Sequence, residues 1–336
     1  MLSQKDLEYR QFVILHSSKA AHHLHLSKEN MVITSPEGEV LTRLSRQKVL
    51  ALMVVGHYTI TSPLMDFCHK NSIAIIVVNT RLRPVFFNSN FSEANYLLRK
   101  RQYQITHGLA LHYAKHFVSS KLLTHIHQVK SIRTKTDYQK QCIERLIEYH
   151  SSIDSVSSLD VLMGIEGNAA RVYFKNYFVQ MDGVVWEGRK PRLKLDVINV
   201  VLDIGYTLLF NFVECIVRLF GFDVYVGLLH QLWHRRKSLV CDFVELFRCI
   251  IDKQVVKSFR LKQFDIKHFS ESKGQFRLKK QHNSQYNAIL MTAIIEHKLE
   301  IFRYVRDFYR AFMKQNEKIE LPLFIINKGN CQEDKD

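Results

Sequence analysis

The stretch IAIIVVNTRLRPVFFNSNFSEANYLLRK, residues 73–100, contains the point at which the chain changes character. It opens with Ile73–Val78, an apolar run rich in β-branched residues that is typical of a strand buried on both faces. This pattern ends around residues 88–90, and Ser92 can then cap a helix that runs from Glu93 to about His116 or beyond. We therefore expect a strand-rich part before residue 90 and a helical part after it.

The segments before residue 73 support this division. Met31–Thr34 and Glu39–Thr42 flank the turn-forming residues Ser35–Gly38, and the order strand, turn, strand predicts a hairpin. Phe12–Leu15 is a further short apolar run, and Ser62–Lys70 predicts one short helix. Few long elements are expected in this part of the chain.

Beyond residue 90 the pattern is helical. Apolar residues at three-and-four spacing predict helices over Glu144–His150, Ser157–Val179, Leu195–Leu219, Ser238–Phe259 and Ser284–Met313. The most apolar segment, Val197–Phe222, also contains Asp, Asn, Glu and Arg, which favours a helix buried in protein over a membrane span. We predict an α+β fold class, with a small N-terminal β-sandwich-like domain over residues 1–90 and a larger all-helical domain over residues 91–336.

Composition and charge narrow the class of partner. The chain has 336 residues, and its 48 Lys and Arg against 32 Asp and Glu give a net charge of +16. A positive field attracts polyanions, so nucleic acid or an anionic membrane surface is the first partner to consider. The alternative is that the Lys and Arg side chains only solvate helix faces. The hydrophobic fraction of 46% excludes disorder as the main state. Six Cys without a CxxC pair, and no signal-peptide pattern, predict a cytosolic protein with reduced thiols.

Glu166 is the first candidate for chemistry. In a helix it would share a face with the small residue Ala169 and the ring of Tyr173. Gly164 and Gly167 flank it, and each glycine costs a helix about 1 kcal/mol relative to alanine. Close packing or access for a ligand must offset that cost, and a carboxylate beside a tight helix crossing is the structural alternative.

Asp242 and Glu245 are the second candidate. They lie three residues apart in an apolar helix that Ser238 can cap, so they project from one face. Two carboxylates in such a setting cost free energy unless a cation lies between them. Arg248 could be that cation in a helix-surface ion pair, and a divalent metal is the other possibility.

His230 lies 12 residues before Asp242, close enough for a loop to fold its imidazole back over the carboxylates. A lone His on an apolar face is more often a core residue. A site of Glu166, His230 and Glu245, with Asp242 close by, would supply hard oxygen ligands and one imidazole. Such a donor set suits Mn²⁺ or Mg²⁺ better than zinc, and either ion can promote attack on a phosphodiester.

Several motifs occur in order: Gly164-Ile165-Glu166-Gly167 with Ala169-Ala170-Arg171, Asn199 with Gly205-Tyr206, Tyr225 with Gly227 and His230, and Ser238-Leu239 with Asp242, Glu245, Phe247 and Arg248. With these motifs the chain resembles the CRISPR adaptation integrase family, the universal CRISPR-associated endonucleases, over about residues 10 to 310. Departures from the family pattern include Cys241, Cys249 and the bulky Trp233 before a basic loop.

The resemblance implies an N-terminal β domain that forms a homodimer and a C-terminal helical catalytic domain. It implies Mn²⁺ or Mg²⁺ held by Glu166, His230 and Glu245, with Asp242 supporting the site. Its partners would be double-stranded prespacer DNA, CRISPR repeat DNA and a small ferredoxin-like adaptation protein. The 3′-hydroxyl of each prespacer strand would attack a repeat phosphodiester in the cytoplasm of a prokaryote, in a type II or type V system.

Basic clusters complete the expectation. Given the family, we assign phosphate contacts to Arg189, Lys190, Arg192, Arg235, Arg236, Lys237, Arg248, Lys273 and Arg277. A solvated face is the alternative for any single cluster. Two other functions stay open: a metal-dependent, structure-specific repair nuclease that uses water as nucleophile, and a non-catalytic DNA-binding scaffold.

Overall fold

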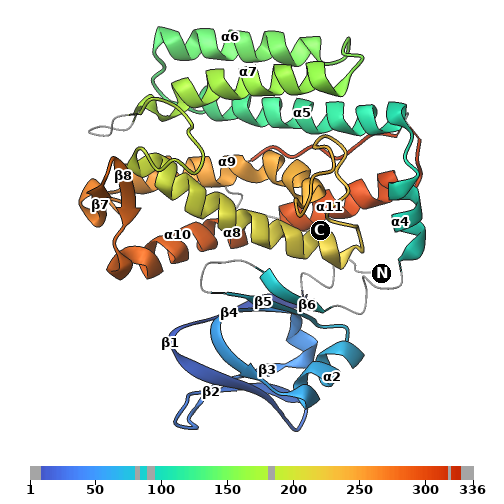
Figure 1. The fold of residues 1–336 in the computed structure, drawn as a ribbon, viewed down its shortest axis with the longest axis vertical. Helices are drawn as coiled ribbons and strands as arrows, with labels where there is room; N and C mark the ends of the chain where they lie inside the picture. Colours follow the sequence, from blue (N-terminus) through green and yellow to red (C-terminus); the bar gives the residue numbers. More distant parts are fainter. Residues whose placement is uncertain (1–8, 80–83, 89–94, 181–185, 317–318, 327–336) are drawn as a thin grey trace, which may run out of the picture. The chain divides into compact units, whose positions relative to one another are not determined.

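The computed structural model describes the chain in two compact units (Figure 1). The residues described are 9–79, 84–88, 95–180, 186–316 and 319–326. The first unit takes in the described residues up to Gln104 together with Glu214–Asp223, and the second takes in Ile105–Val213 and the residues from Val224 onward. Helix α4 (Tyr96–Tyr103) therefore groups with the strands, although it lies beyond the domain boundary predicted at residue 90.

The first unit is built on one six-stranded sheet, in the order β3-β2-β1-β4-β5-β6. Its strands are β1 (Gln11–Ser27), β2 (Asn30–Thr34), β3 (Val40–Ser45), β4 (Val49–Ile60), β5 (Ala74–Val78) and β6 (Pro84–Asn88). Strand β4 pairs in parallel with β1 and β5, and the remaining neighbours are antiparallel. The β-domain-then-helices order is confirmed, but the described strands form a single sheet in place of a two-sheet sandwich.

Local signals located three elements of this unit correctly. The predicted hairpin is β2–β3, closed by a bond from the Gly38 N–H to the Ser35 carbonyl of 3.0 Å. The predicted short helix is α2 (Ser62–Lys70). The run at residues 73–78 is β5, where Ile75 and Ile76 point to opposite faces and are both buried. As expected, few of the elements are long: β1 and β4 have 17 and 12 residues and pair along most of their lengths, and the other strands have five or six residues.

One long helix expected over Glu93–His116 was also wrong. Its predicted cap, Ser92, lies outside the described residues. Within them the segment forms two helices, α4 and α5 (His107–Lys130). Asn95 caps the first through Leu98 N–H at 3.4 Å, and Thr106, in extended conformation, caps the second through Leu109 N–H at 3.3 Å. An extended capping residue ends one helix and begins another.

The second unit is mainly helical. Besides α5 it contains α6 (Asp137–Ser152), α7 (Leu159–Tyr177), α8 (Val197–Leu219, which continues into the first unit), α9 (Ser238–Arg260), α10 (Asn283–Glu296) and α11 (Lys298–Phe312). The helix predicted over 284–313 is thus two helices that meet at His297. A hairpin of β7 (Phe269–Ser272) and β8 (Gln275–Leu278) interrupts the unit that was predicted to be all helical.

Helix packing places α9 at the centre of this unit. Helices α5, α6 and α7 lie side by side, and α9 packs against both α5 and α10 (Figure 1). The rings of Phe117, Phe243 and Phe308, from α5, α9 and α11, lie with their centroids 5.1–5.4 Å apart. Lys121 follows Phe117 by one turn on the same face of α5. The aromatic contact therefore fixes where the Lys121 side chain meets α9.

Helix α8 is the one described helix long and apolar enough to cross a membrane. Its most apolar window is 78% buried inside the protein, as expected for the core helix that the sequence predicts. At Gly205 a Cβ would lie 2.5 Å from Ile251 of α9. The glycine allows α8 to approach α9 closely.

Candidate active site

Glu166 and Glu245 converge on the same cation. Lys121 Nζ contacts Glu166 Oε1 and lies 2.5 Å from Glu245 Oε2. The three side chains come from α5, α7 and α9, and their exposed fractions are only 3%, 24% and 8% for Lys121, Glu166 and Glu245. Two of the three predicted metal ligands thus meet around one positive charge.

The electrostatics of this cluster favour its charged form. Burial by itself lowers the pKa of Lys121, but the carboxylates of Glu245 and Glu166 outweigh burial and raise it. Burial by itself raises the pKa of Glu245, but Arg248, Lys121 and His230 outweigh burial and hold that pKa well below its usual range. The carboxylate of Glu245 is therefore an anion at neutral pH, and the charges of Arg248 and Lys121 contribute most to this.

Asp242 holds His230 in place. The buried carboxylate accepts hydrogen bonds from the backbone N–H groups of Leu228 (2.6 Å), Leu229 (3.1 Å) and His230 (3.0 Å). It also lies 2.6 Å from His230 Nδ1. Because the Asp242 oxygens accept from three backbone N–H groups, they serve as acceptors toward the ring as well, which places the imidazole proton on Nδ1 and leaves the lone pair on Nε2. Asp242 therefore positions the imidazole and the turn before it.

A glycine permits this arrangement. A Cβ on Gly227 would lie 2.4 Å from the carbonyl oxygen of His230 and 2.7 Å from Cβ of Ser238. Only a residue without a side chain allows the turn to close against the start of α9. The Leu239 N–H donates to the Val224 carbonyl at 3.1 Å and joins the same two segments. The loop between His230 and α9 is thus anchored at its base.

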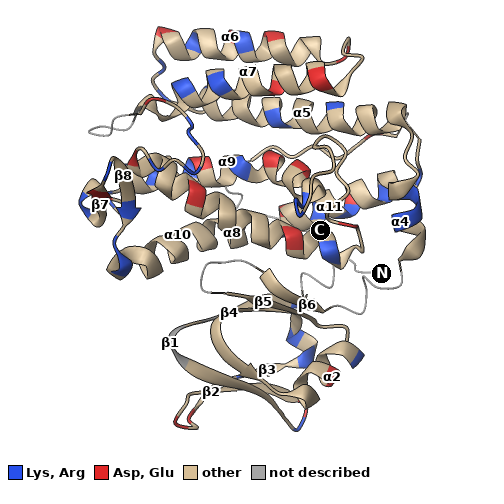
Figure 2. Ribbon diagram, in the orientation of Figure 1, with Lys and Arg blue, Asp and Glu red and all other residues tan. Residues whose placement is uncertain are grey.

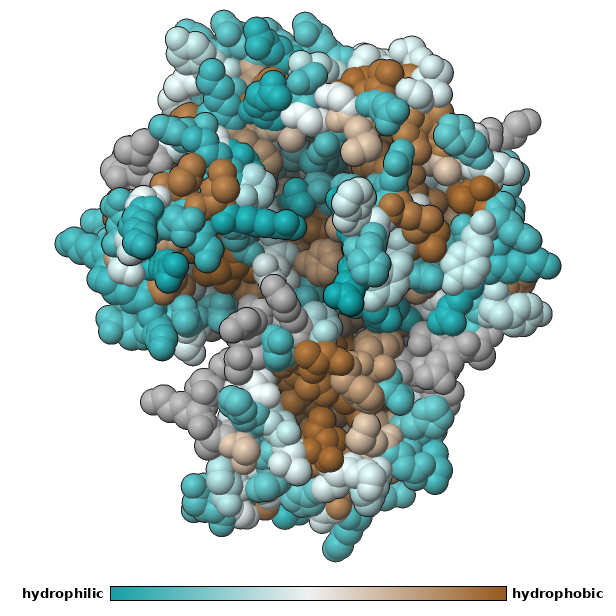
Figure 3. Space-filling view, viewed as in Figure 1, coloured by the Kyte–Doolittle hydropathy of each residue, from teal (hydrophilic) through white to brown (hydrophobic). Residues whose placement is uncertain are grey.

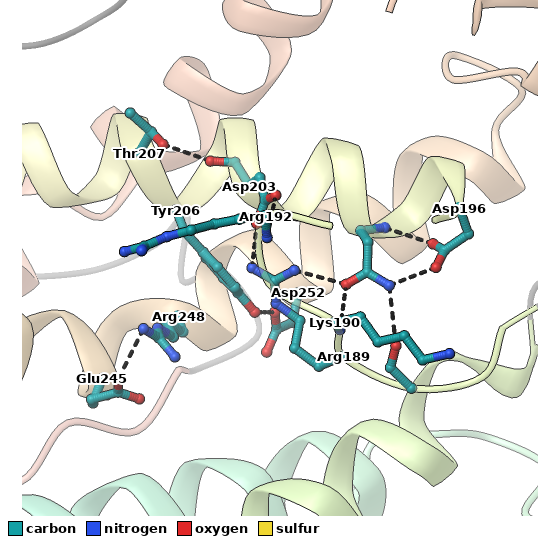
Figure 4. A network of polar contacts seen from close by, with 12 residues as sticks. Arg189, Lys190, Arg192, Asp196, Asp203, Tyr206, Thr207, Glu245, Arg248 and Asp252 are labelled. Atoms are coloured by element: carbon teal, nitrogen blue, oxygen red, sulfur yellow. Dashed lines mark hydrogen bonds and ion pairs between the residues drawn. The ribbon is translucent and has the colours of Figure 1, made fainter. Parts of the chain in front are cut away.

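Glu245 pairs with two cationic side chains, whereas the sequence analysis considered only one of them, Arg248. Arg248 Nη2 lies 2.9 Å from Glu245 Oε1, so the predicted ion pair exists (Figure 4). It does not serve Asp242, whose oxygens are occupied by the turn and His230. Lys121 is the second cation on Glu245, and helical spacing within α9 could not reveal it.

The donor chemistry fits a divalent metal, although an ammonium neutralises the carboxylates. Among the residues described, no group of three His, Cys, Asp or Glu side chains already stands in metal-holding geometry. The Lys121 ammonium lies where Glu166 and Glu245 meet, and it supplies there the positive charge that a metal ion would supply. The Nδ1 bond of His230 to a carboxylate is the outer-shell contact typical of metal-binding imidazoles. The donor atoms present, two carboxylates and an imidazole, are thus of the kinds that Mn²⁺ and Mg²⁺ take.

A second, buried network of hydrogen bonds lies next to the Glu245–Arg248 ion pair. Asp252 of α9 accepts hydrogen bonds from the hydroxyls of Tyr206 and, at 3.0 Å, Tyr173. The Tyr206 ring also faces two guanidiniums, with Cζ of Arg248 at 4.9 Å and Cζ of Arg189 at 5.3 Å from its centroid. Through the Tyr206 ring this network links Arg248, beside Glu245, to Asp252; these four residues are labelled in Figure 4. Sequence analysis did not identify Asp252 as part of a network.

Arg189 is directed inward. Its guanidinium donates to Asn199 Oδ1 at 2.7 Å and to Asp203 Oδ1 at 2.5 Å (Figure 4). Asn199 also accepts from Lys190 N–H at 2.9 Å, so the segment is fixed on α8. The phosphate contact assigned to Arg189 from sequence remains a prediction, and its visible role is to hold this segment. The adjacent Arg192 side chain is exposed.

The other predicted DNA contacts are mostly at the surface. The basic residues around β7, β8 and the segment before α8 stand out in Figure 2. Phe276 N–H donates to the Lys194 carbonyl at 2.8 Å, so residues 189–194 lie beside the hairpin that carries Lys273 and Arg277. Arg235 and Arg236 are exposed, and Lys237 is half-buried at the start of α9. Two predicted basic clusters are therefore neighbours.

Comparisons with known proteins identify the family of this chain. Residues 15–290 match the family described as CRISPR associated protein Cas1. The chain belongs to the Cas1 family. A curated relative, CRISPR-associated endonuclease Cas1 1 of Thermodesulfovibrio yellowstonii, is 29% identical over 238 residues, which cover 68% of this chain and 75% of that protein.

Solved Cas1-like structures share the fold. The Cas1 protein of Thermotoga maritima has a TM-score of 0.72 at 20% identity, covering 95% of this chain and 100% of that one. A casposase bound to an integration product has a TM-score of 0.69 at 18% identity, covering 92% of both chains. A chain of a partial Cas6-RT-Cas1–Cas2 complex has a TM-score of 0.72 at 17% identity, covering 92% of this chain and 97% of that one. At these identities the likeness shows the fold.

Proposed function

We propose that this chain is a metal-dependent DNA integrase of CRISPR adaptation, which joins the 3′-hydroxyl ends of prespacer DNA to the repeat by direct transesterification. The observation that carries the proposal is the convergence of Glu166 and Glu245 on one cation, with His230 held by Asp242, which lies three residues before Glu245 in α9. Membership of the Cas1 family and the likeness to a casposase bound to an integration product support it.

Glu166, Glu245 and His230 Nε2 would hold Mn²⁺ or Mg²⁺. When bound, such an ion polarises a phosphodiester and favours the deprotonated form of an attacking hydroxyl. Asp242 keeps the His230 proton on Nδ1, so that Nε2 presents its lone pair. Lys121 and Arg248 place two further positive charges beside Glu245, where a phosphate anion would otherwise be repelled.

The reaction exchanges one phosphodiester for another. The prespacer 3′ oxygen forms a bond to phosphorus and gives up its proton, while the bond to the leaving 3′ oxygen of the neighbouring nucleotide breaks and that oxygen takes a proton. No oxidant or nucleotide cofactor is needed. The protein must hold the attacking 3′ oxygen in line with the phosphorus and the leaving oxygen, and exclude water as a competing nucleophile.

DNA would lie across the basic residues of the second unit. Lys273, Arg277 and Arg192 are exposed on adjoining segments, and Arg235 and Arg236 are exposed in the loop before α9. Contacts of this kind position a duplex without reading its sequence. Affinity for duplex DNA should fall steeply between low and moderate salt, and a nearly constant affinity would remove the assignment.

The expected assembly is a homodimer that joins a small ferredoxin-like partner. Figure 3 shows hydrophobic side chains gathered on the first unit, and Val40, Leu41 and Val85 are exposed apolar residues of that unit. Such surfaces are typical of protein contacts. The structural neighbour from a complex that contains Cas2 supports the larger assembly.

The decisive experiment is strand transfer of a labelled prespacer into a repeat-containing plasmid with Mn²⁺. Wild type should form branched, joined DNA. Glu166→Ala, His230→Ala and Glu245→Ala should bind DNA but form no joined product. Asp137→Ala, at an exposed carboxylate of α6, is the matched control and should join DNA normally. Joining by any of the three site variants would remove that residue from the proposed ligand set.

The same assay separates the proposal from hydrolysis. Curated relatives are named endonucleases, which favours a nuclease as the second candidate. A hydrolytic repair nuclease would shorten the labelled strand and give no branched product. A non-catalytic scaffold would bind DNA and give neither product.

A further inference from the structure

A cavity of about 400 Å³ lies in the second unit, where the ends of three helices meet. His127 and Ser131 line it from the end of α5, and Tyr177 lines it from the end of α7. Lys257 lines it from the last turn of α9. Earlier turns of the same helices supply the candidate active site, but none of the described lining residues belongs to that site. The cavity has the size of a pocket for a small molecule.

The wall of the cavity on α9 is positively charged. Lys253, Lys257 and Arg260 line it at spacings of four and three residues, so they share one face of the helix. None of the described lining residues is Asp or Glu, and neither Lys253 nor Lys257 has an ion-pair partner within the described residues. The charge of the two lysines is thus not neutralised by a described carboxylate.

The helix ends beside the cavity account for part of this charge. Basic residues in the last turn favour the partial negative charge of a helix end, so Lys257 and Arg260 alone indicate nothing. Lys253 lies one turn earlier. The three helix ends carry about half a negative charge each, and three full positive charges exceed that sum. An anionic ligand would offset the excess.

The remaining lining is mostly apolar. Ile132, Val256 and Ile326 are buried side chains that line the cavity, and Leu261 adds a more exposed one. An inorganic anion keeps its hydration and leaves such a wall in contact with water, whereas a ligand with a flat apolar body removes the wall from water. The ligand should therefore carry both an anionic group and an apolar body.

Polar groups on α5 can recognise the edge of that body. His127 Nδ1 is buried without a hydrogen-bond partner among the described residues, and a neutral imidazole has one acceptor nitrogen. The Ser131 hydroxyl donates to the Gln128 carbonyl at 2.7 Å and keeps its acceptor lone pairs. Both groups can thus accept a hydrogen bond from the amino group of a base.

We propose that the cavity binds a free nucleotide whose base carries an amino group. Its phosphate would lie on Lys253, Lys257 and Arg260, and its base would lie against the apolar wall with the amino edge toward His127 and Ser131. Two lysines and a guanidinium suit a phosphate, because its oxygens accept several charge-assisted hydrogen bonds. This binding function is separate from the joining of DNA strands, since the proposed metal ligands do not line the cavity.

Calorimetric titration of the full chain with AMP, adenosine and inorganic phosphate tests both parts of the ligand. EDTA is present throughout, so that no metal ion contributes to binding. We expect AMP to bind at least roughly 10-fold more tightly than adenosine or phosphate, because only AMP uses the cationic and apolar walls together. AMP should also raise the melting temperature of the protein further as its concentration rises.

Four variants locate the ligand. Lys253→Gln combined with Lys257→Gln should weaken AMP binding by roughly 10- to 100-fold, because two charge-assisted contacts are lost. Lys257→Gln alone, at an exposed position that does not disturb the core, should weaken AMP binding in the same direction. His127→Phe keeps the shape of a ring and should weaken AMP binding by roughly 5-fold while phosphate affinity stays unchanged. Lys130→Gln, at an exposed lysine of α5 outside the cavity, is the matched control and should bind AMP as wild type does.

Four results would overturn the inference. Equal affinity for AMP and inorganic phosphate would mean that the cavity takes an adventitious ion only. Unchanged AMP affinity in both Lys257→Gln and the double variant would place the phosphate elsewhere. Displacement of AMP by a blunt DNA duplex would show that the cations belong to a DNA-binding surface. The absence of binding heat with AMP up to about 5 mM would remove the site altogether.

Discussion

Lys121 Nζ and Glu245 Oε2 lie 2.5 Å apart, and the same ammonium contacts Glu166. One lysine of α5 therefore joins carboxylates from α7 and α9. Two carboxylates that are largely withdrawn from water repel each other and lose hydration. The fold therefore requires a cation between Glu166 and Glu245, and the site requires it too. A divalent ion would satisfy the same condition with a larger charge.

Lys121→Met tests this relationship. Without the ammonium the buried carboxylate of Glu245 and the half-buried carboxylate of Glu166 lose their shared partner, so the free energy of unfolding without metal should fall by roughly 3–5 kcal/mol. Mn²⁺ should restore more stability to the variant than it adds to wild type, because it replaces the missing charge. Denaturant unfolding with and without Mn²⁺ measures both effects.

Lys140→Met is the control for that experiment, because the Lys140–Asp137 pair is exposed and should change stability little. Equal Mn²⁺ responses in wild type and Lys121→Met would contradict the shared-cation account.

Asp242→Asn should loosen His230. The amide cannot accept all the bonds that Asp242 accepts from Leu228, Leu229 and His230, and its NH₂ group would face an N–H donor in either orientation. We expect Mn²⁺ affinity and strand transfer to fall by roughly 10- to 100-fold while DNA affinity is kept. Calorimetric titration with Mn²⁺ measures the first effect, and unchanged affinity would show that Asp242 does not position the imidazole.

Local chemistry explains which parts of the fold could be predicted. Pro63 at the start of α2 and the turn residues Ser35–Gly38 act within a few residues, and both elements were located. The apolar run that forms β4 fits a strand or a buried helix equally well, and only pairing with β1 and β5 decides between them. At His297 the apolar spacing continues across the junction of two helices, so the pattern predicted one.

In the candidate site, too, local spacing predicted some features and could not predict contacts between distant segments. Asp242, Glu245 and Arg248 share one helix, and their spacing predicted a cation beside Glu245. Lys121 is 124 residues before Glu245, and helical periodicity carries no information about distances between helices. Arg189 was assigned a phosphate contact from its basic cluster, and that contact stays a prediction; the bonds of its guanidinium to Asn199 and Asp203 depend on how the segment meets α8, which the cluster does not reveal.

Asp252 should give the protein a pH-dependent stability. Burial raises the pKa of Asp252 to about 6, although hydrogen bonds from Tyr206 and Tyr173 oppose the shift. The native state therefore binds this proton more tightly than the unfolded chain. The resulting stabilisation is fully present at a pH below 3.8, the ordinary pKa of this carboxyl, and is lost as the pH rises through about 6.

Asp252→Asn removes the titrating group. Urea unfolding from pH 4 to pH 7 should show a decline in wild type that is absent in the variant, with a difference of up to roughly 3 kcal/mol. Asp137→Asn, at an exposed position, should keep the wild-type profile. The same decline in Asp252→Asn would assign it to other groups.

Substitutions at Gly164 and Gly167 can distinguish effects on stability from effects on function. The cost of two helical glycines beside Glu166 led us to expect close packing or ligand access, and a Cβ at either position would meet no atom within 4 Å. Close packing is thereby excluded at both residues within the described structure. Gly164→Ala and Gly167→Ala should each raise the free energy of unfolding by about 1 kcal/mol, because alanine favours the helix and clashes with nothing.

Strand transfer should move in the opposite direction if DNA approaches α7 at these positions. We expect both alanine variants to unfold at higher denaturant concentration yet join prespacer more slowly, with Gly227→Ala as the contrasting case that loses stability through its clash with the His230 carbonyl. Measuring unfolding and joining on the same preparations distinguishes the two roles. If the stabilised variants join DNA at the wild-type rate, the open face beside Glu166 is not a path for the substrate.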